Sequence, residues 1–353
     1  MLYLILGFDY ELFFGKNYKS YDEVLFEPSE RITEVLEENN VCATFFADVC
    51  SVYQHQRMGL FDYSSKFSEQ IQSFCKKGQD IQLHIHPHWL HSTYNEKNWV
   101  FPKDYYRIHD FLGEEVGATE IIENGVEYLN NTLKCVNLNY KCVAYRAGGY
   151  CLQPWDDILP ILVKSGIVID SSVAMYRTNS KDKLHYYDYS KLPEDLNFWI
   201  KKGSIQELSS DKQGEMELFE VPIGFCKQDL LGRFIMGKRR TFTKGEPNGE
   251  AMSFTGNKEN IFMKIIKYNF RKKMISVDNM SAKLLMLAIN YIYHKYNSKN
   301  KDMYMSIIGH PKSFTGDAFN NLDLFLKLVP KQPEKYQIIT MRDVYDRLKL
   351  RDL

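Results

Sequence analysis

Residues 82–89 read QLHIHPHW, a short apolar strand pattern that runs into a cluster of histidines. Four of the chain's nine histidines fall between residues 84 and 91. In parallel sheets, functional side chains gather at the carboxyl ends of strands. Two neutral imidazoles with one carboxylate bind zinc-type ions and leave a coordination position for water. Strand alternation puts His84, His86 and His88 on one face, so spacing does not decide which two bind, and a surface loop of unpaired histidines is the alternative.

A pair of carboxylates, Asp9 and Glu11, follows the apolar run at residues 2–6. Alternation along a strand places both side chains on the same face. Two carboxylates this close bind a cation or share a proton, because two unpaired negative charges together are costly. The D-x-E pattern alone is common, and it is more often a solvated strand end than a metal or catalytic site.

Short apolar runs alternate with stretches of helical period along most of the chain, which is typical of βα units. The predicted strands are 2–9, 41–47, 80–85, 140–146, 166–171, 217–223, 303–309 and 336–340. The predicted helices are 29–38, 67–77, 118–132, 155–165, 281–296 and 318–328. Eight strands with helices between them predict an α/β protein with a β/α barrel.

The region from about residue 176 to 300 breaks this alternation, and we predict an insertion there, with a barrel strand near 217–223 inside it. No linker marks a second domain, so residues 1–353 are predicted to form a single domain. Basic runs at 238–240 and 264–273 fit an anionic substrate, although a solvated helix face explains the second run more simply.

Composition limits the partners. Lys and Arg total 45 and Asp and Glu total 45, so a net charge of zero gives no global attraction to nucleic acid or a membrane surface. No window approaches the roughly 18 apolar residues of a membrane span. The apolar amino-terminal run lacks the basic segment of a signal peptide, and the seven cysteines lack CxxC spacing. These features predict a cytoplasmic protein with reduced thiols.

Taken in order, several segments resemble the motifs of the NodB-type polysaccharide deacetylases, carbohydrate esterase family 4. Residues 78–88 are similar to the second motif, in which two metal-binding histidines are four residues apart, and residues 9–11 resemble the first motif in a D-x-E variant. The other similar segments are 43–46 (second strand), 146–150, 170–172 and 308–311 (third, fourth and fifth motifs) and 219–222 (a late E-x-P strand). The resemblance covers about residues 1–175, 216–224 and 303–345.

The resemblance implies a distorted (β/α)7–8 barrel of the NodB type with a large insertion, and a metal-dependent hydrolase. Glu11, His84 and His88 would hold one divalent ion, zinc by preference, with cobalt, nickel or manganese as alternatives. The ion would act as Lewis acid and generate the attacking nucleophile. His86 is an extra histidine, to which we assign a substrate contact.

The resemblance also implies the catalytic roles. Asp9 would be the general base, held by Arg146, and His310 would be the general acid that protonates the leaving amine. Asp170 would be the carboxylate that keeps the His310 imidazole cationic and oriented. Backbone N–H groups in the glycine turn after Arg146 would bind the oxyanion. Predicted substrate contacts are His86, Trp89, Gly149 and Tyr150.

Two departures from the family pattern leave alternatives open. Tyr10 separates Asp9 from Glu11, where the family usually has adjacent aspartates, so these two residues could exchange the roles of base and ligand. Gly148 stands where the third motif usually has proline, which leaves Gly149 or Tyr150 as the oxyanion donor.

The resulting hypothesis is a hydrolase of linear amide bonds that removes an N-acetyl group from an amino sugar, in a bacterial surface polysaccharide or its cytoplasmic precursor. One alternative is an amidase or deformylase acting on a non-polymeric amide. Another is a silent carbohydrate-binding homologue. A third takes residues 84–86 as the H-x-H of an amidohydrolase or phosphoesterase barrel with two or three ions. The sequence does not name the sugar or the oligomeric state.

Overall fold

A computed structural model describes residues 1–15, 17–95, 98–179, 185–226, 249, 273–297 and 301–351. Its centre is a nine-stranded sheet with the path β12-β1-β2-β3-β6-β7-β9-β8, to which β13 adds beside β1. The strands are β1 (Leu2–Tyr10), β2 (Thr44–Asp48), β3 (Asp80–Ile85), β6 (Ala144–Ala147), β7 (Ile169–Asp170), β8 (Trp199–Ile200), β9 (Leu218–Glu220), β12 (Met303–Gly309) and β13 (Tyr336–Ile338). All eight predicted strands are therefore present, and β8 is an unpredicted addition.

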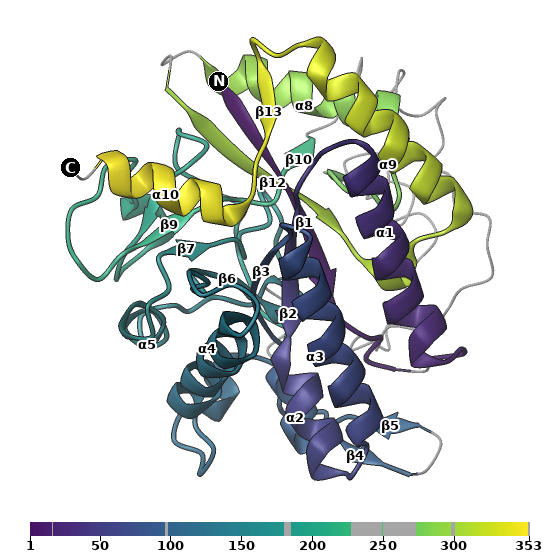
Figure 1. Ribbon diagram of the computed structural model, residues 1–353. Coiled ribbons are helices and arrows are strands. Elements are labelled where there is room, and N and C mark those ends of the chain that lie inside the picture. Colours follow the sequence, from purple (N-terminus) through teal and green to yellow (C-terminus); the bar gives the residue numbers. More distant parts are fainter. Residues whose placement is uncertain are drawn as a thin grey trace, which may run out of the picture.

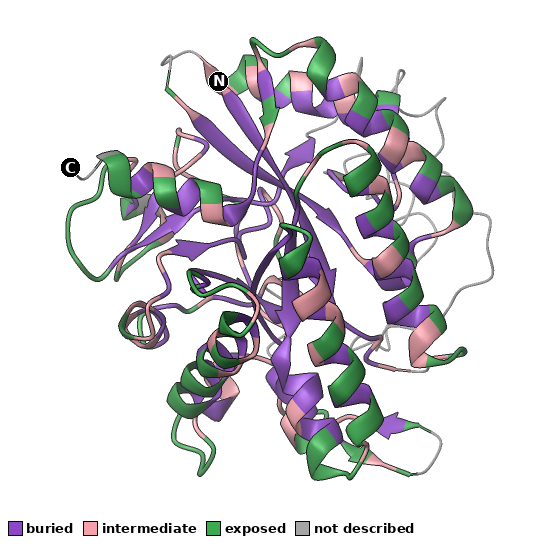
Figure 2. Ribbon diagram, viewed as in Figure 1, coloured by how far each residue is buried: buried purple, intermediate pink, exposed green. Residues whose placement is uncertain are grey.

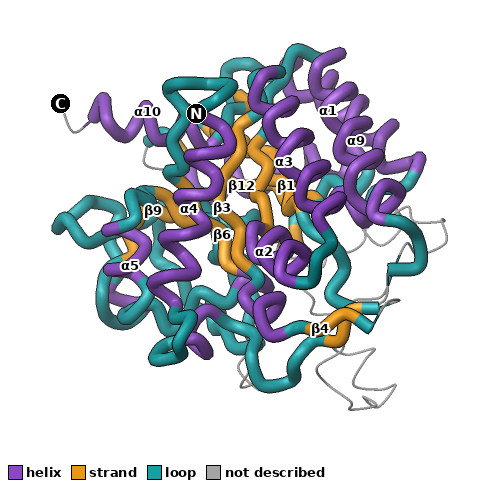
Figure 3. The backbone as a smooth tube through the Cα atoms, turned by 60° about the horizontal axis from the view of Figure 1, so that its bottom comes forward, coloured by secondary structure: helices purple, strands orange, loops and turns teal. Residues whose placement is uncertain are grey.

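The helices surround this sheet (Figure 3). The predicted ones are α1 (Glu27–Glu38), α3 (Phe61–Lys76), α4 (Ala118–Lys134), α5 (Leu159–Lys164), α8 (Ala282–Tyr296) and α9 (Gly316–Leu328). Two more, α2 (Val49–Arg57) and α10 (Met341–Arg351), lie in stretches where we predicted no helix. Short two-stranded ribbons pair β4 (Thr93–Tyr94) with β5 (Trp99–Val100) and β10 (Phe225–Cys226) with β11 (Lys273–Met274).

Single turns of helix connect these elements. They are η1 (Asp22–Phe26), η2 (Pro87–His91), η3 (Ile108–Phe111), η4 (Gly148–Tyr150), η5 (Ile205–Glu207), η7 (Pro311–Ser313) and η8 (Val329–Lys331). Three of them, η2, η4 and η7, begin within two residues of the ends of β3, β6 and β12. These three turns set the direction in which the chain leaves the sheet at the predicted site.

The sheet curls until its two ends meet. β12, β1, β2, β3, β6, β7 and β9 run parallel in this order. Beyond β9, Ser306 N donates to the Pro222 carbonyl and Gly224 N donates to the Ser306 carbonyl, both at 2.9 Å. These bonds join the segment after β9 to β12, so the architecture is a distorted β/α barrel.

The eighth predicted barrel strand, β13, has a different place. It pairs with the first residues of β1, from Leu2 to Leu4, whereas β2 pairs with β1 from Gly7 to Tyr10. β13 therefore pairs with the part of the β1 edge that β2 leaves open, and it is not a further strand of the barrel. Among the described residues, seven parallel strands form the barrel.

Burial follows the layers. Every residue of β1 is buried, as expected for a parallel strand covered on both faces (Figure 2). Helix α1 has a buried face with Ile32 and Leu36 and an exposed face with Glu34 and Glu38, so its amphipathic pattern explains its position against the sheet. α1 packs beside α9 and α3 beside α4 (Figure 1).

No helix in the described ranges is long and apolar enough to span a bilayer. The division of the chain into one barrel domain and an insertion over about residues 176–300 stays a prediction. The basic run at 238–240 and nearly all of that at 264–273 lie outside the described residues.

Candidate active site

The carboxyl ends of the parallel strands gather most of the predicted site residues at one edge of the barrel. Parallel strands place their carboxyl ends together, which explains how positions distant in sequence meet. The buried polar residues at or just beyond these ends are Asp9, Glu11, Asp48, His84, His86, His88, Arg146, Asp170, Glu220 and, partly exposed, His310.

Arg146 is fully buried and fixes Asp9 at the centre of this edge. Its Nη1 donates to Asp9 Oδ1 at 2.5 Å. Its Nε donates to the Ser171 carbonyl at 3.0 Å and its Nη2 to the Ser306 hydroxyl at 2.6 Å. The guanidinium also lies 3.9 Å from the centre of the Phe46 ring. A buried ion pair with its donors satisfied holds the Asp9 carboxylate in one orientation, so the predicted contact between the two residues is observed.

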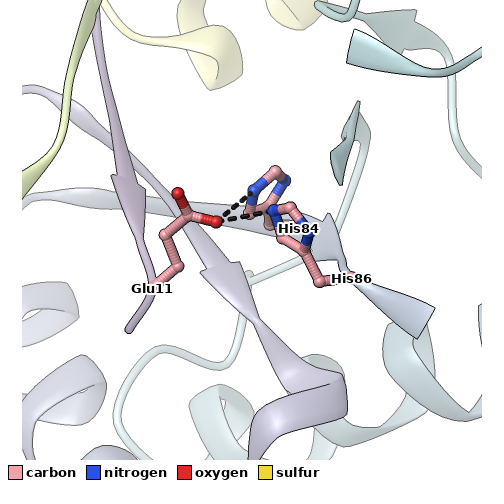
Figure 4. A group of neighbouring side chains, drawn as sticks. All are labelled: Glu11, His84 and His86. Carbon is pink, nitrogen blue, oxygen red and sulfur yellow. Dashed lines mark hydrogen bonds and ion pairs between the residues drawn. The ribbon is translucent and has the colours of Figure 1, made fainter. Parts of the chain in front are cut away.

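Glu11 has a different partner for each of its oxygens. Lys312, on η7, donates from Nζ to Glu11 Oε1 at 2.8 Å and to the Leu12 carbonyl at 2.8 Å. Glu11 Oε2 faces His86 Nε2 at 2.6 Å and His84 Nε2 at 3.2 Å (Figure 4). Burial raises the pKa of Glu11, but Lys312 and the two histidines outweigh it and hold that pKa well below its usual value. Glu11 is therefore an ionised carboxylate with one oxygen directed at two imidazoles.

These three residues form a compact set of potential metal ligands. One donor atom from each of Glu11, His84 and His86 lies within 4.8 Å of the other two, and all three residues are buried. His84 Nδ1 donates to the Arg146 carbonyl at 2.7 Å, so in the neutral imidazole the lone pair is on Nε2, which faces the cluster. Carboxylate and neutral imidazole are the ligands that zinc binds in hydrolases. The residues present therefore fit a single divalent ion.

His88, the predicted third ligand, lies beside this set and not in it. Its ring stacks on Tyr106 at 5.1 Å and meets the Phe14 ring edge-on at 4.6 Å. Burial lowers the pKa of His88 well below its usual value, and neither ring nitrogen has a hydrogen-bond partner. The structure thus groups Glu11 and His84 with His86, to which the sequence assigned a substrate contact. A buried neutral imidazole with two unpaired nitrogens is unusual and marks this position as part of the site.

His310 follows β12 and pairs with a carboxylate that we did not predict. Its Nδ1 lies 2.8 Å from Asp278 Oδ2, and its Nε2 lies 3.5 Å from Asp9 Oδ2. Burial lowers the pKa of His310, but Asp278, Asp9 and Glu11 outweigh it and raise that pKa above its usual value. The imidazole is therefore cationic more readily than a free histidine. Its side chain is 19% exposed, so His310 forms the open side of an otherwise buried cluster.

Asp170 does not contact His310, which corrects our assignment of the orienting carboxylate. Its oxygens accept bonds from the Ser172 hydroxyl at 2.7 Å and the Ser172 N–H at 2.9 Å. Glu220 is its neighbour in register on β9. Burial raises the pKa of both carboxyls, and Asp170 raises that of Glu220 further. The two acids therefore share a buried site that disfavours two negative charges at once.

The glycine turn after Arg146 packs directly against the histidines. A Cβ on Gly148 would lie 2.5 Å from His86 Nδ1, which explains why glycine stands there. Gly149 and Tyr150 both have positive φ, at 58° and 68°. For a tyrosine this conformation is strained, and such strain clusters at functional sites.

Trp89 is 0% exposed, so it cannot contact a substrate as we predicted. Its indole packs against Trp99 at 5.1 Å and Phe101 at 4.8 Å. The η2 turn that begins at Pro87 directs this side chain into the core beside α2. Trp89 thus anchors the histidine segment to the core.

Three functional candidates escaped the sequence analysis: Lys312, Asp278 and Asp48. Lys312 lies two residues after His310 in the sequence, and this closeness could have marked it as a candidate. Asp278 lies in a region without strand periodicity. Asp48 ends β2, accepts a bond from the His86 N–H at 3.2 Å, and burial raises its pKa to about 7. A carboxylate at the end of a predicted strand could have been recognised.

Neither protein-family models nor curated protein sequences match the chain. Solved structures do. A provisionally named polysaccharide deacetylase from Mycobacterium smegmatis has a TM-score of 0.51 and 14% identity, with 100% of this chain and 91% of that chain covered. The chain has the polysaccharide deacetylase fold. The fold predicted from the sequence motifs is thereby confirmed, and at this identity the likeness concerns the fold alone.

Two further solved structures lie below a TM-score of 0.5. A provisionally named polysaccharide deacetylase from Pseudomonas aeruginosa PAO1 has a TM-score of 0.47 and 13% identity, covering 97% of this chain and 88% of that one. The PuuE allantoinase has a TM-score of 0.48 and 12% identity, with coverage of 97% and 88%.

Proposed function

We propose that the protein is a metal-dependent N-deacetylase that acts on an amino sugar. One observation carries this proposal: three kinds of catalytic group meet at one edge of the barrel. They are a buried cluster of one carboxylate and two histidines, a carboxylate bound by an arginine, and a histidine paired with a carboxylate. Those parts are Glu11 with His84 and His86, Asp9 held by Arg146, and His310 paired with Asp278. Amide hydrolysis needs a Lewis acid, a base and an acid, and the site offers residues for all three.

Glu11, His84 and His86 would hold the divalent ion, zinc by preference. A bound ion of this kind supplies a Lewis acid that polarises the acyl carbonyl and lowers the pKa of water. His84 is oriented for this role by the Arg146 carbonyl, and Lys312 occupies the second oxygen of Glu11. The two contacts fix both side chains before the ion arrives, which limits the cost of ordering them.

Asp9 is the general base in this proposal. Its Oδ1 is bound to Arg146, which leaves Oδ2 to accept a proton from the attacking water. His310 Nε2 faces the same oxygen at 3.5 Å and donates a proton to the departing nitrogen. Asp278 holds the opposite nitrogen of the ring and so keeps Nε2 directed inward. The two proton-transfer groups thus flank one position, where the scissile amide would lie.

The test is acetate release from N-acetylated glycans, nucleotide sugars and lipid-linked sugars. The protein is stripped of metal with a chelator and refilled with one equivalent of zinc, beside an Asp9→Asn variant. We expect zinc-dependent release that the variant loses by about 10²–10⁴-fold, the usual contribution of a general base. If zinc binds tightly but no acetate appears, formyl and non-sugar amides become the substrates to examine; absence of zinc binding would refute the proposal.

The sequence hypothesis also names the molecule that contains the amino sugar and the location of the enzyme. We propose that the amino sugar belongs to a bacterial surface polysaccharide or its precursor. The cytoplasmic location of the protein stays a prediction. Fractionation of cells that produce the protein, with acetate release measured in each fraction, would test the location. Activity confined to an extracellular fraction would contradict it.

A further inference from the structure

Arg177 lies on the loop that follows β7, at the same edge of the barrel as the catalytic candidates. Its guanidinium carbon lies 5.3 Å from the centre of the Tyr150 ring and 5.9 Å from that of Tyr187. Arg177 N donates to the Ala174 carbonyl at 3.1 Å, and its carbonyl accepts from Tyr189 N at 2.8 Å. The residue is therefore held by its backbone and by two aromatic rings, while its side chain stays only half-buried.

Arg177 has no ion-pair partner among the residues that the structure describes. The nearby acidic residue Asp188 lies opposite Thr178 in an antiparallel bridge, and its Oδ1 accepts the Ser190 N–H at 2.9 Å. A guanidinium stacked on aromatic rings is weakly hydrated, and its fork of donors fits a carboxylate or a phosphate. One hydrogen bond from Arg177 goes to the Tyr187 phenol, and because a guanidinium has five N–H donors, further donors remain for a ligand beside the site.

The Tyr150 ring connects Arg177 to the metal-ligand candidates. Tyr150 ends the glycine turn whose Gly148 touches His86. Its strained backbone, with φ of 68°, is held by the Tyr189 hydroxyl, which donates to the Tyr150 carbonyl at 2.8 Å. The turn and its tyrosine therefore form one continuous wall from the histidines to Arg177.

Electrostatics support this placement. Burial raises the pKa of the Tyr150 phenol, the charge of Arg177 opposes that rise, and the charges of Asp9 and Glu11 add to it. The phenol therefore lies within electrostatic range of Arg177 on one side and of the strand-end carboxylates on the other. A substrate with its amide at Asp9 that extends along Tyr150 would reach Arg177.

We propose that Arg177 binds an anionic group of the substrate, which makes that substrate an acidic N-acetylated sugar. This inference rests on the deacetylase function proposed above. The anionic group has two sources with the same chemistry, the carboxylate of a uronic acid and the phosphate of a glycosyl phosphate, because both accept paired bonds from a guanidinium. Arg177 is then a specificity residue next to the reacting groups.

The alternative is that Arg177 only supports the Tyr150 ring. A purely structural role would weaken binding of neutral and acidic sugars equally, whereas a specificity role changes the ratio between them. The measurement must therefore compare matched ligands that differ only in charge.

Binding is measured by calorimetry on zinc-loaded protein that carries Asp9→Asn, which prevents turnover. The first pair of probes is a heparosan hexasaccharide, which contains glucuronic acid and N-acetylglucosamine, and its carboxyl-reduced form. The second pair is N-acetylglucosamine 1-phosphate and N-acetylglucosamine, which differ by one phosphate group. The variants are Arg177→Gln and Arg177→Lys. Arg31→Gln is the matched control, because Arg31 also stacks on a ring, that of Phe319, but lies on α1 away from the site.

We expect at least one acidic probe to bind about 10- to 100-fold more tightly than its neutral partner, as hydrogen bonds to charged groups allow. Arg177→Gln should abolish that preference, Arg177→Lys should keep part of it, and Arg31→Gln should keep all of it. A preference seen only in the uronate pair indicates a uronic acid, and one seen only in the phosphate pair indicates a glycosyl phosphate. Lack of any charge preference, equal losses on both members of a pair, or no binding of any probe would each overturn the inference. Charge-dependent binding without acetate release by the wild-type protein would contradict the deacetylase and leave the anion site standing.

Discussion

Lys312 Nζ lies 2.8 Å from Glu11 Oε1, while the other oxygen of Glu11 faces His84 and His86. The lysine is only 8% exposed, so this is a buried ion pair at the edge of the proposed metal-ligand set. Lys312 compensates the Glu11 charge when no ion is bound. It also leaves a single oxygen of Glu11 for an ion.

The first prediction follows from that compensation. Lys312→Met should destabilise the metal-free protein by about 3 kcal/mol, because it leaves a buried carboxylate without its cation. Zinc restores the missing positive charge, so the rise in Tm on adding zinc should be larger in the variant than in the wild type. Thermal unfolding with chelator and with zinc measures both quantities.

The control for this experiment is Lys327→Met. Lys327 pairs with Asp323 at 2.7 Å, but its side chain is 61% exposed, and exposed pairs contribute little. We expect this variant to match the wild type in both conditions. An unchanged zinc-dependent rise in Tm for Lys312→Met would show that Lys312 does not compensate Glu11.

The second prediction separates Asp278 from Asp170. Asp278 raises the pKa of His310, so Asp278→Asn should lower it, and the alkaline limb of the kcat/KM profile should move to lower pH. kcat/KM should also fall, by no more than the 10²–10⁴-fold that general acid catalysis supplies. Asp170→Asn should leave the alkaline limb in place, because Asp170 contacts Ser172 and not His310. An alkaline limb that moves with Asp170→Asn instead would restore our original assignment.

The third prediction concerns the ligand set. His86→Gln should weaken zinc affinity by more than about 100-fold. Even residues that only hydrogen-bond to a metal ligand typically contribute about 10–100-fold to metal affinity, and a direct ligand contributes more. His88→Gln should weaken it less, because the His88 nitrogens lie outside the compact set. Competition with a chromophoric chelator measures both affinities, and His294→Gln is an exposed control. The reverse order of losses would favour the His-x3-His pair that the sequence resemblance implied.

The alternation of strands and helices predicted the barrel well, because a parallel strand covered on both faces leaves a continuous apolar run. β1 and β12 are such runs and were predicted within a residue of their observed bounds. α2 and α10 escaped because their sequences are largely polar, and packing against neighbouring elements stabilises such helices where propensity and pattern do not. β8 has two residues, too few to leave a pattern.

Sequence analysis could predict site residues only where they stand at the end of a recognisable strand. Asp9, His84 and His310 follow strong apolar runs, so their meeting at one barrel edge was predictable. Asp278 was not, because it reaches His310 through the bridge between Ser276 and Ile308, a tertiary pairing that leaves no mark in the sequence. Trp89 failed for a related reason: the turn after β3 directs it inward, and composition alone does not show direction.

The last prediction concerns pH and stability. His55 is fully buried between Ser51, whose carbonyl lies 2.6 Å from Nδ1, and Tyr21, whose hydroxyl lies 3.1 Å from Nε2. Burial lowers the pKa of His55 from 6.5 to about 4. Since the folded pKa is depressed, the unfolded chain binds the proton first as pH falls, so stability is full above about 6.5 and is lost between that pH and about 4.

This shift corresponds to about 3 kcal/mol for the single residue. Denaturant unfolding of metal-free protein at pH 7, 6, 5 and 4.5 measures the dependence. Other buried histidines also contribute to the slope, so the informative quantity is the difference between the wild type and His55→Gln. The variant should be less stable at pH 7, because it loses a buried ring, yet its stability should fall less steeply below pH 6.5. Parallel curves for the two proteins would show that His55 takes up its proton equally in the folded and unfolded states.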